Sequence, residues 1–356
     1  MARPGVGDPD VTREAGPLAV VVRGGVVESV HVGHLVVLRP DGSVLASVGD
    51  PDATVFARSS LKPLQAAAML DAGLEVDDEG LALACASHSG TAEHLTVVRR
   101  VLAGAGLTEA DLQNTPDLPL DAAAAFAWRA DGGAASSVTQ NCSGKHAAML
   151  ATCVANGWDA ATYRSPDHPL QVRVRETIER LTGVPVTAVT VDGCGAPLFS
   201  TTVRGLAAAF GRIAAAAAGG AEDDALARVG RAIRAHPFLV GGPGRDVSRF
   251  MAAVPGLVAK DGAEGVYGAG FADGGGVAFK VADGSARARP AILGAVVANR
   301  WQQDPSENPG AAAVAELRAI RHVPVLGHGE PVGAVHAFIG AGTPGAERAV
   351  VGRRWE

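Results

Sequence analysis

The sequence contains no apolar run of the ~18 residues that a membrane-spanning helix needs. Residues 1–16 also lack the apolar stretch of a signal peptide. The formal net charge of −6 provides no basic surface for nucleic acid or an anionic membrane. We therefore expect a cytoplasmic protein that binds neither nucleic acid nor membranes, with a flexible segment over residues 1–16 and a single domain over residues 17–356.

Cysteine is scarce as well, because only four occur in 356 residues: Cys85, Cys142, Cys153 and Cys194. So few cysteines in so long a chain do not form a disulfide framework, and free thiols are expected. Hydrophobic residues make up 47% of the chain and charged residues 19%, which is ordinary for a globular protein of this length.

The pattern of apolar residues predicts strands at both ends of the chain and helices between them. Near the start, residues 18–22 and 25–33 are short β-branched runs, and residues 34–49 predict a hairpin that turns at Pro40-Asp41-Gly42. In the middle, residues after Lys62, residues 146–157 and residues 221–237 predict helices, the last with Glu222, Asp223 and Asp224 at its start. Near the end, residues 276–293 predict a hairpin that turns at Ala282-Asp283-Gly284, a helix follows from about Pro290 to Trp301, and residues 330–340 predict a last strand. This order predicts an α/β (α+β) fold, with an antiparallel sheet from both chain ends flanked by helices and a helical middle region.

The stretch Ser59-Ser60-Leu61-Lys62 raises the first chemical question. Residues three apart on a helix share a face, so the Ser59 hydroxyl and the Lys62 amine can form a nucleophile and its base. Pro63 fits only in a first helical turn, which predicts a helix that begins near Ser60 with Ser59 at its mouth. The alternative is an ordinary helix start in which one of the two serines caps the helix and the lysine is solvated. If Ser59 is the nucleophile, Ser60 is the expected cap.

Four more stretches place functional residue types where turns or helix starts are expected. "CASHSG" (85–90) follows an apolar run, and "QNCSGKHAAML" (140–150) crowds polar residues before a helix whose backbone amides can hold an anion. "TVDGCGAP" (190–197) is a strand end and a tight turn, and "GLVAKDG" (256–262) ends an apolar run on Lys260. Each also has a plain structural interpretation as a turn, a capped helix or a solvated lysine. Cysteine spacing alone gives only weak support for a metal site.

Six motifs occur in the order and approximate spacing of one family: "ARSSLKPLQ", "CASHSG", "NCSGKHAAML", "PDHPLQ", "DGCGAP" and "LVAKDGAEGVYGAG". From about Leu18 to Ala337 the chain resembles the asparaginase II family of the Rhizobium etli type. The resemblance implies a fold similar to the serine β-lactamases and penicillin-binding proteins, and it implies a homodimer. The threonine-glycine-glycine-threonine motif of a better-known asparaginase class is missing here.

The resemblance also implies a role for each matching residue. Ser59 and Lys62 would be the nucleophile and its base, and Ser87 and Lys260 would form a second pair that transfers protons. The implied zinc ligands are Cys142, Lys145 and Cys194. The implied substrate-binding residues are Arg58, His88, Asn141, His146, Asp192 and Gly193. A further cysteine of the rhizobial members is replaced here by Val247, which bears on the breadth and affinity of substrate recognition.

We therefore expect an L-asparaginase that hydrolyses the side-chain amide of L-asparagine through a serine acyl-enzyme. Two other classes of function stay open. A β-lactamase-like or penicillin-binding-like acyl hydrolase shares Ser-x-x-Lys, although the later Lys-Thr-Gly motif is missing. A non-enzymatic relative that binds zinc or a metabolite is the second, although all four serine and lysine positions are intact.

Overall fold

The computed structural model describes residues 11–219 and 224–338. Within these residues the main sheet has eight strands, every neighbouring pair antiparallel. Its order is β10 (Val323–Gly327), β11 (Glu330–Ala337), β1 (Gly16–Arg23), β2 (Val26–Leu38), β9 (Gly276–Val281), β8 (Val266–Gly270) and β7 (Val258–Asp261), with β3 (Val44–Val48) paired to β2. The first strand thus lies between the second and the last, which confirms the predicted sheet from both chain ends. A small sheet joins β4 (Thr54–Phe56), β6 (Pro197–Thr202) and β5 (Val189–Val191).

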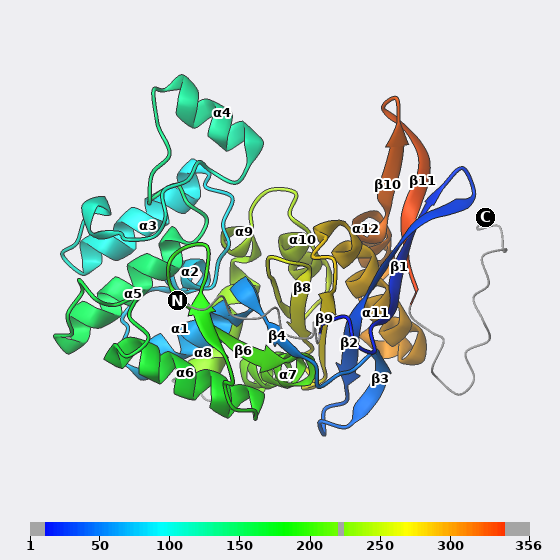
Figure 1. Ribbon diagram of the computed structural model, residues 1–356, viewed down its shortest axis with the longest axis horizontal. Coiled ribbons are helices and arrows are strands. Elements are labelled where there is room, and N and C mark those ends of the chain that lie inside the picture. Colours follow the sequence, from blue (N-terminus) through cyan, green and yellow to red (C-terminus); the bar gives the residue numbers. More distant parts are fainter. Residues whose placement is uncertain (1–10, 220–223, 339–356) are drawn as a thin grey trace, which may run out of the picture.

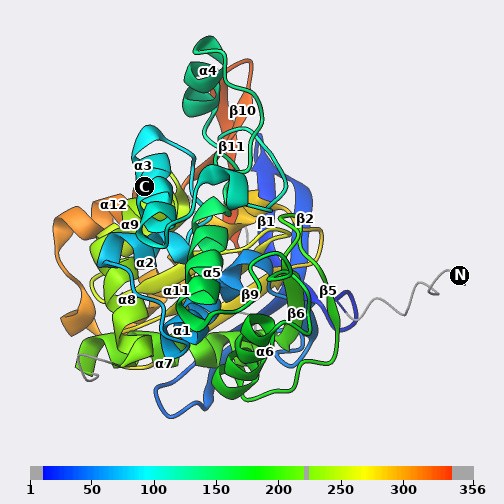
Figure 2. The same cartoon turned by 90° about the vertical axis from the view of Figure 1, so that its left-hand side faces the viewer.

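Helices fill the middle of the chain, as predicted, and lie beside the sheet (Figure 1). They are α1 (Lys62–Asp71), α2 (Asp78–Ala84), α3 (Ala92–Gly104), α4 (Ala122–Ala130), α5 (Ser143–Asn156), α6 (Pro169–Thr182), α7 (Val203–Gly219), α8 (Ala225–Ala235), α9 (Pro237–Val240) and α10 (Asp246–Ala253); α11 (Arg289–Gln303) and α12 (Ala311–Arg321) follow the sheet strands. Short 3-10 turns are η1 (Arg58–Leu61), η2 (Glu109–Asp111), η3 (Ala286–Ala288) and η4 (Pro305–Glu307). Figure 1 and Figure 2 both show α4 projecting from the body. No helix of the described ranges has the length and apolar character to span a membrane.

Helix α7 packs so closely on β8 and β9 that the strands have no room for side chains at the crossing. A Cβ atom on Gly270 would clash with the Phe210 carbonyl oxygen, and one on Gly276 would clash with the Ala207 carbonyl oxygen. Glycine is therefore required because the helix backbone itself lies on the strands. This packing holds β8 in place, and β8 in turn pairs with β7, in which Lys260 lies opposite Gly268.

Most of the predicted turns and helix ends are confirmed. The hairpin around Pro40-Asp41-Gly42 joins β2 to β3, and α5 ends at Asn156 with Gly157 in the left-handed conformation. Asp224 caps α8 by accepting a hydrogen bond from the Ala227 amide (2.8 Å), while the predicted acidic residues Glu222 and Asp223 lie outside the described residues. Residues 1–10 of the predicted flexible segment and residues 339–340 of the predicted last strand also lie outside them.

The hairpin predicted at Ala282-Asp283-Gly284 is wrong. After β9 the chain turns directly into η3 and α11 instead of forming a second strand, and β9 pairs with β2 and β8. Asp283 explains the difference, because its carboxylate accepts hydrogen bonds from the Ser285 amide (2.8 Å) and contacts the His31 ring (2.7 Å). These contacts direct the chain toward a helix start.

Candidate active site

The chain enters the site through a strained residue. Arg58 has a φ of +51°, a left-handed conformation that is costly for a side chain other than glycine. An ion pair from its Nε to Asp192 Oδ1 (2.8 Å) holds it there, and Glu264 Oε1 lies 3.9 Å from its Nη1. The next residue, Ser59, is half-buried in η1. Strain of this kind occurs most often at functional sites, so it singles out this turn.

Ser60 does not cap the helix, and that prediction is wrong. Its buried hydroxyl donates a hydrogen bond to the Lys260 carbonyl oxygen (3.1 Å). The cap positions of η1 and α1 are Ala57 and Leu61, and neither makes a side-chain capping bond. The Ser60 hydroxyl instead ties the start of α1 to β7, two segments far apart in the sequence. Pro63 lies in the first turn of α1, as predicted.

Lys62 is buried, with 1% of its surface exposed, and its amine makes three polar contacts. Nζ donates to the Ala86 carbonyl oxygen, to Ser87 Oγ (3.1 Å) and to Cys142 Sγ (3.1 Å). The structure therefore places Lys62 against the second serine of the resemblance. Within residues 11–219 and 224–338 no hydrogen bond joins the Ser59 hydroxyl to either lysine of the predicted pairs.

Lys260 is fully buried and bonds to its neighbour in the chain. Nζ lies 2.5 Å from Asp261 Oδ1 and donates to the Asp261 carbonyl oxygen (2.6 Å). The predicted Ser87–Lys260 pair is not formed among the described residues, because Ser87 bonds to Lys62 and Lys260 to Asp261. Burial lowers the pKa of Lys260 to about 8; Asp261 opposes this shift and the positive charge of Lys62 adds to it. An amine with this pKa gains and loses protons near neutral pH.

His88 is buried in a fixed neutral form. Burial, with smaller effects of the His94 and Lys62 charges, holds its pKa well below the usual range. Nδ1 accepts a hydrogen bond from the Gly90 amide (3.1 Å), which assigns the proton to Nε2. Nε2 therefore donates to Ser143 Oγ (2.8 Å). Ser143, at the start of α5, belongs to the polar stretch noted in the sequence, but the resemblance assigned it no role.

The three predicted zinc ligands lie together in the structure. Lys145 Nζ lies 3.2 Å from Cys194 Sγ, and the Cys142 and Cys194 thiols interact. The hydrogen bond from Cys142, opposed by burial and assisted by Lys145, lowers the pKa of Cys194 to about 4. The same bond and burial raise the pKa of Cys142 to about 12. Despite the opposing effect of burial, the charge of Cys194 raises the pKa of Lys145.

Two thiolate sulfur atoms are donors that zinc prefers, and the Lys145 amine is an unusual donor that can coordinate only without its proton. With these protons removed, the cluster fits the metal. No group of three histidine, cysteine, aspartate or glutamate side chains suited to a metal occurs in the described part of the chain. The cluster of Cys142, Lys145 and Cys194 is not such a group, because its third donor is a lysine.

The remaining predicted substrate-binding residues surround these clusters. His146 Nδ1 contacts the Tyr163 hydroxyl (2.6 Å), while its Nε2 is buried with no hydrogen-bond partner among the described residues. Burial, with the charge of Lys145, holds the pKa of His146 well below its usual range. Asn141 Oδ1 accepts a hydrogen bond from Gln140 (3.0 Å) and lies 3.2 Å from Cys142 Sγ. Gly193 is exposed, and its amide donates to Asp192 Oδ1 (2.8 Å).

One composition signal would have found much of the site. The sequence has 31 lysines and arginines but only four lysines, at positions 62, 145, 260 and 280. Three of the four are buried and belong to the clusters above. In a chain that uses arginine for nearly every positive charge, a lysine marks a position where an amine that can lose its proton is needed. Sequence reasoning also missed Asp261, which contacts Lys260, and Arg245, which contacts Asp261.

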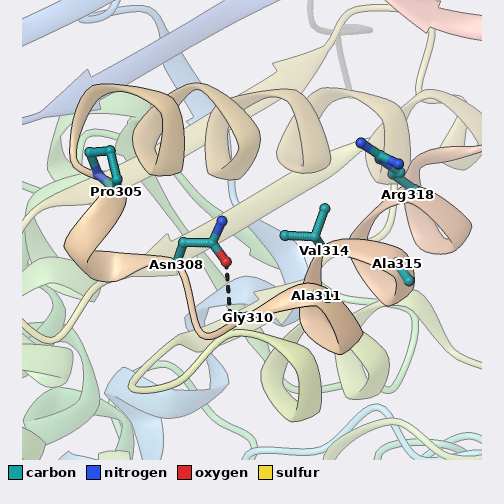
Figure 3. Close-up of a pocket in the computed structure, with 7 residues that line it drawn as sticks. All are labelled: Pro305, Asn308, Gly310, Ala311, Val314, Ala315 and Arg318. Atoms are coloured by element: carbon teal, nitrogen blue, oxygen red, sulfur yellow. Dashed lines mark hydrogen bonds between the residues drawn. The ribbon is translucent and has the colours of Figure 1, made fainter.

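Two surface hollows lie outside the cluster of serines and lysines. One of about 460 Å³ is lined by Arg58, Glu264 and Lys280 among others, so it borders the outer side of the strained turn. Another of about 440 Å³ lies between η4 and α12, where Arg318 lines it (Figure 3). Neither is lined by Ser59 or Ser87.

Comparisons with known proteins follow this geometry. No curated protein matches the chain significantly. Among solved structures, the protein Mglu aligns with 14% identity over 78% of this chain and 68% of its own, with a TM-score of 0.40. A probable glutaminase from Bacillus subtilis aligns with 16% identity over 76% of this chain and 83% of its own (TM-score 0.36). A β-lactamase from Mycobacterium bovis aligns with 14% identity over 75% of this chain and 94% of its own (TM-score 0.34). TM-scores this low carry no conclusion about activity.

The comparison with protein families is decisive. The model of the family described as L-asparaginase II matches residues 19–337, which is nearly the whole chain and includes all the residues of the site. The chain therefore belongs to the L-asparaginase II family of amidohydrolases.

Proposed function

We propose that this chain is an L-asparaginase that hydrolyses L-asparagine to L-aspartate and ammonia through an acyl-enzyme on Ser59. The observation that carries the proposal is the burial of the Lys62 amine against the Ser87 hydroxyl, one helical turn from the half-buried Ser59. Family membership supports amide hydrolysis as the reaction class. We also propose a cytoplasmic location and, on the family resemblance, a homodimer.

Ser59 suits the role of nucleophile better than Ser87. It lies just before α1, where backbone amides stabilise developing negative charge, and it is accessible, whereas Ser87 is 6% exposed. Once Lys62 has given up a proton, Ser59 Oγ attacks the amide carbon, and the Ser59 proton passes to Lys62 directly or through the Ser87 hydroxyl that contacts Lys62. The carbon–nitrogen bond then breaks, and ammonia leaves with a proton from the Lys260 ammonium. Water hydrolyses the resulting ester: its proton restores Lys260, and Lys62 returns a proton to the departing Ser59 oxygen.

Arg58 and Asp192 supply charges that match an amino acid substrate. The guanidinium is complementary to an α-carboxylate and the carboxylate to an α-ammonium group. In the structure the two side chains pair with each other and are partly accessible, at 25% and 11% exposure. Binding an amino acid here would exchange this internal ion pair for two pairs with the substrate.

Zinc is a further part of the proposal, with Cys142, Lys145 and Cys194 as the residues that would hold it. When bound, it would supply fixed positive charge and link the start of α5 to the turn after β5. The chain's own residues carry the proton transfers. Lys62 contacts Cys142 Sγ, so the metal ligands and the catalytic amine share a wall of the site.

The test is ammonia release from L-asparagine by the wild type, by Ser59→Ala and by Ser43→Ala, in which an exposed turn serine is replaced as a control. We expect Ser59→Ala to lower the rate by at least about a thousandfold and Ser43→Ala to leave it unchanged. Near-normal release by Ser59→Ala would contradict the assignment.

Covalent labelling identifies the nucleophile independently of turnover. A diazoketone analogue of asparagine should add one equivalent to the wild type, and peptide mass spectrometry should locate it on Ser59. If the adduct forms on Ser87 and survives in Ser59→Ala, Ser87 is the nucleophile. Turnover of nitrocefin, with no release of ammonia from asparagine, would favour the β-lactamase-like alternative.

A further inference from the structure

A buried ionic cluster lies behind Lys260. Both carboxylate oxygens of Asp261 are used: Oδ1 lies 2.5 Å from Lys260 Nζ, and Oδ2 lies 2.6 Å from Arg245 Nη2 and 3.4 Å from Arg289 Nη1. Asp261 is 4% exposed and Lys260 is fully buried. One carboxylate is therefore shared by three cations, and each cation weakens the hold of Asp261 on the other two.

Arg245 is the member of this cluster that also reaches the serine side of the site. Its Nη1 donates to the Ser87 carbonyl oxygen (3.4 Å) while its Nη2 binds Asp261. The surrounding backbone is tied together as well, because the Ser87 amide donates to the Val240 carbonyl oxygen (3.1 Å). Arg245 thus bridges the segment that carries Ser87 and the strand that carries Lys260.

We propose that Arg245 is a positioning residue for amide hydrolysis: by binding Asp261 and the Ser87 carbonyl together, it limits how firmly Lys260 holds its proton and keeps Ser87 in line with Lys62. The inference rests on the proposed function, in which the Lys260 ammonium gives its proton to departing ammonia. Arg245 itself touches neither reacting serine hydroxyl, so its effect is exerted through Asp261 and the Ser87 backbone.

The charged and titratable groups around Lys260 come from every element packed against it. Asp261 on β7, Lys62 on α1, Cys85 after α2 and Arg245 before α10 interact with Lys260 itself. Asp246 on α10, Tyr267 on β8 and Arg289 on α11 interact with its partner Asp261. This set contains more cations than carboxylates. Burial raises the pKa of Asp246, so one of the two carboxylates ionises less readily than usual. Burial lowers the pKa of Lys260 to about 8; Asp261 opposes this shift, and the charges of Lys62 and Arg245 add to it.

Two substitutions should move the Lys260 pKa in opposite directions. Arg245→Met removes a cation and leaves Asp261 more fully to Lys260, so the pKa should rise. Asp261→Asn removes the carboxylate, so the pKa should fall. Arg249→Met on α10 is the matched control, because it removes only an ion pair to Glu316 at the surface (2.8 Å).

The measurement uses the small number of lysines. Labelling lysine with ¹³C at Cε gives four side-chain signals, which Lys→Arg variants assign, and each signal is followed against pH. We expect the Lys260 midpoint to rise by about half a pH unit or more in Arg245→Met. It should stay at the wild-type value in Arg249→Met. A midpoint that does not move in Arg245→Met would overturn the inference, whatever the state of Asp261→Asn.

Kinetics complete the test. In Arg245→Met the kcat for asparagine should fall about tenfold with KM within about twofold, and the alkaline limb of the rate profile should follow the NMR midpoint upward. A lower kcat with an unmoved alkaline limb would mean a merely structural role and would also overturn the inference. If the wild type releases no ammonia, the proposed function fails, while the NMR midpoints still report whether Arg245 controls Lys260.

Discussion

At the scale of single residues, the charges of Cys194 and Lys145 compensate each other in the cluster with Cys142. The Cys194 thiolate lies between the Cys142 thiol and the Lys145 ammonium. Each of these two neighbours donates a proton toward the thiolate sulfur, and burial excludes water from all three. A soft divalent cation that enters the cluster must therefore displace two protons, one from a thiol and one from an amine.

This proton displacement makes zinc binding strongly dependent on pH. Because both groups hold their protons more firmly than usual, binding should weaken as pH falls, by up to about a hundredfold for each pH unit when two protons leave. Elemental analysis of the purified protein should find zinc in the wild type and in Cys153→Ser, and none in Cys142→Ser. Zinc retained at one equivalent in Cys142→Ser would show that the metal binds elsewhere.

The sequence predicted which residues gather at the site better than it predicted their partners. Ser59, Lys62, Ser87 and Lys260 are carried by η1, α1, the segment after α2 and β7, which the fold brings together. The pairing differs because a hydrogen bond depends on the direction of a long side chain. Lys62 turns toward Ala86 and Ser87, and Lys260 takes the carboxylate next to it.

At the scale of elements, α7 is in close backbone contact with β8 and β9. Gly268, Gly270 and Gly276 on the strands and Gly211 on the helix all face backbone or ring atoms where a Cβ would clash. Close packing of this kind tolerates no added methyl group, because neither a helix backbone nor a paired strand can shift alone.

Gly270→Ala should therefore destabilise the protein by about 2 kcal/mol or more. The matched control is Gly104→Ala at the end of α3, where a Cβ meets open space and the substitution should be neutral or stabilising. Urea denaturation followed by circular dichroism measures both. Equal stabilities for the two variants would show that α7 can move away from the sheet.

Elements were predictable where local chemistry agrees with the fold. Residues 34–49 combine two apolar runs with a glycine turn, and the structure forms β2, β3 and the hairpin between them. The stretch around Asp283 carries an equally good turn signal, yet a helix follows it. The reason is tertiary, since β9 is already paired on both edges and has no free edge for another strand.

At the scale of the whole molecule, several histidines are buried as neutral rings. His88 and His94 stack with a centroid distance of 5.2 Å, and His94 stacks in turn on Phe238. Burial, with a smaller effect of the Arg245 charge, lowers the pKa of His94 to about 4, and the pKa values of His88 and His146 lie well below their usual range. These rings resist protonation as long as the chain is folded.

Acid should therefore destabilise the protein early. The unfolded chain binds these protons below about pH 6.5 and the folded chain does not, so stability is full above that pH and declines as pH falls toward about 4. Each histidine contributes a slope of up to about 1.4 kcal/mol per pH unit. Urea midpoints at three pH values measure the slope, which His94→Gln should reduce and His322→Gln, an exposed control, should not. Equal slopes in all three proteins would contradict this account.

The scarcity of lysine has a practical consequence for coupling chemistry. Three of the four lysine amines are buried, and only Lys280 is partly accessible, on the strand that pairs with β2. Dyes and supports that acylate amines therefore meet one lysine on the described surface, while arginine carries the surface's positive charge. Because Lys280 lines the hollow that borders Arg58, a fluorophore attached there stands at the rim of the candidate site and can report the arrival of a substrate.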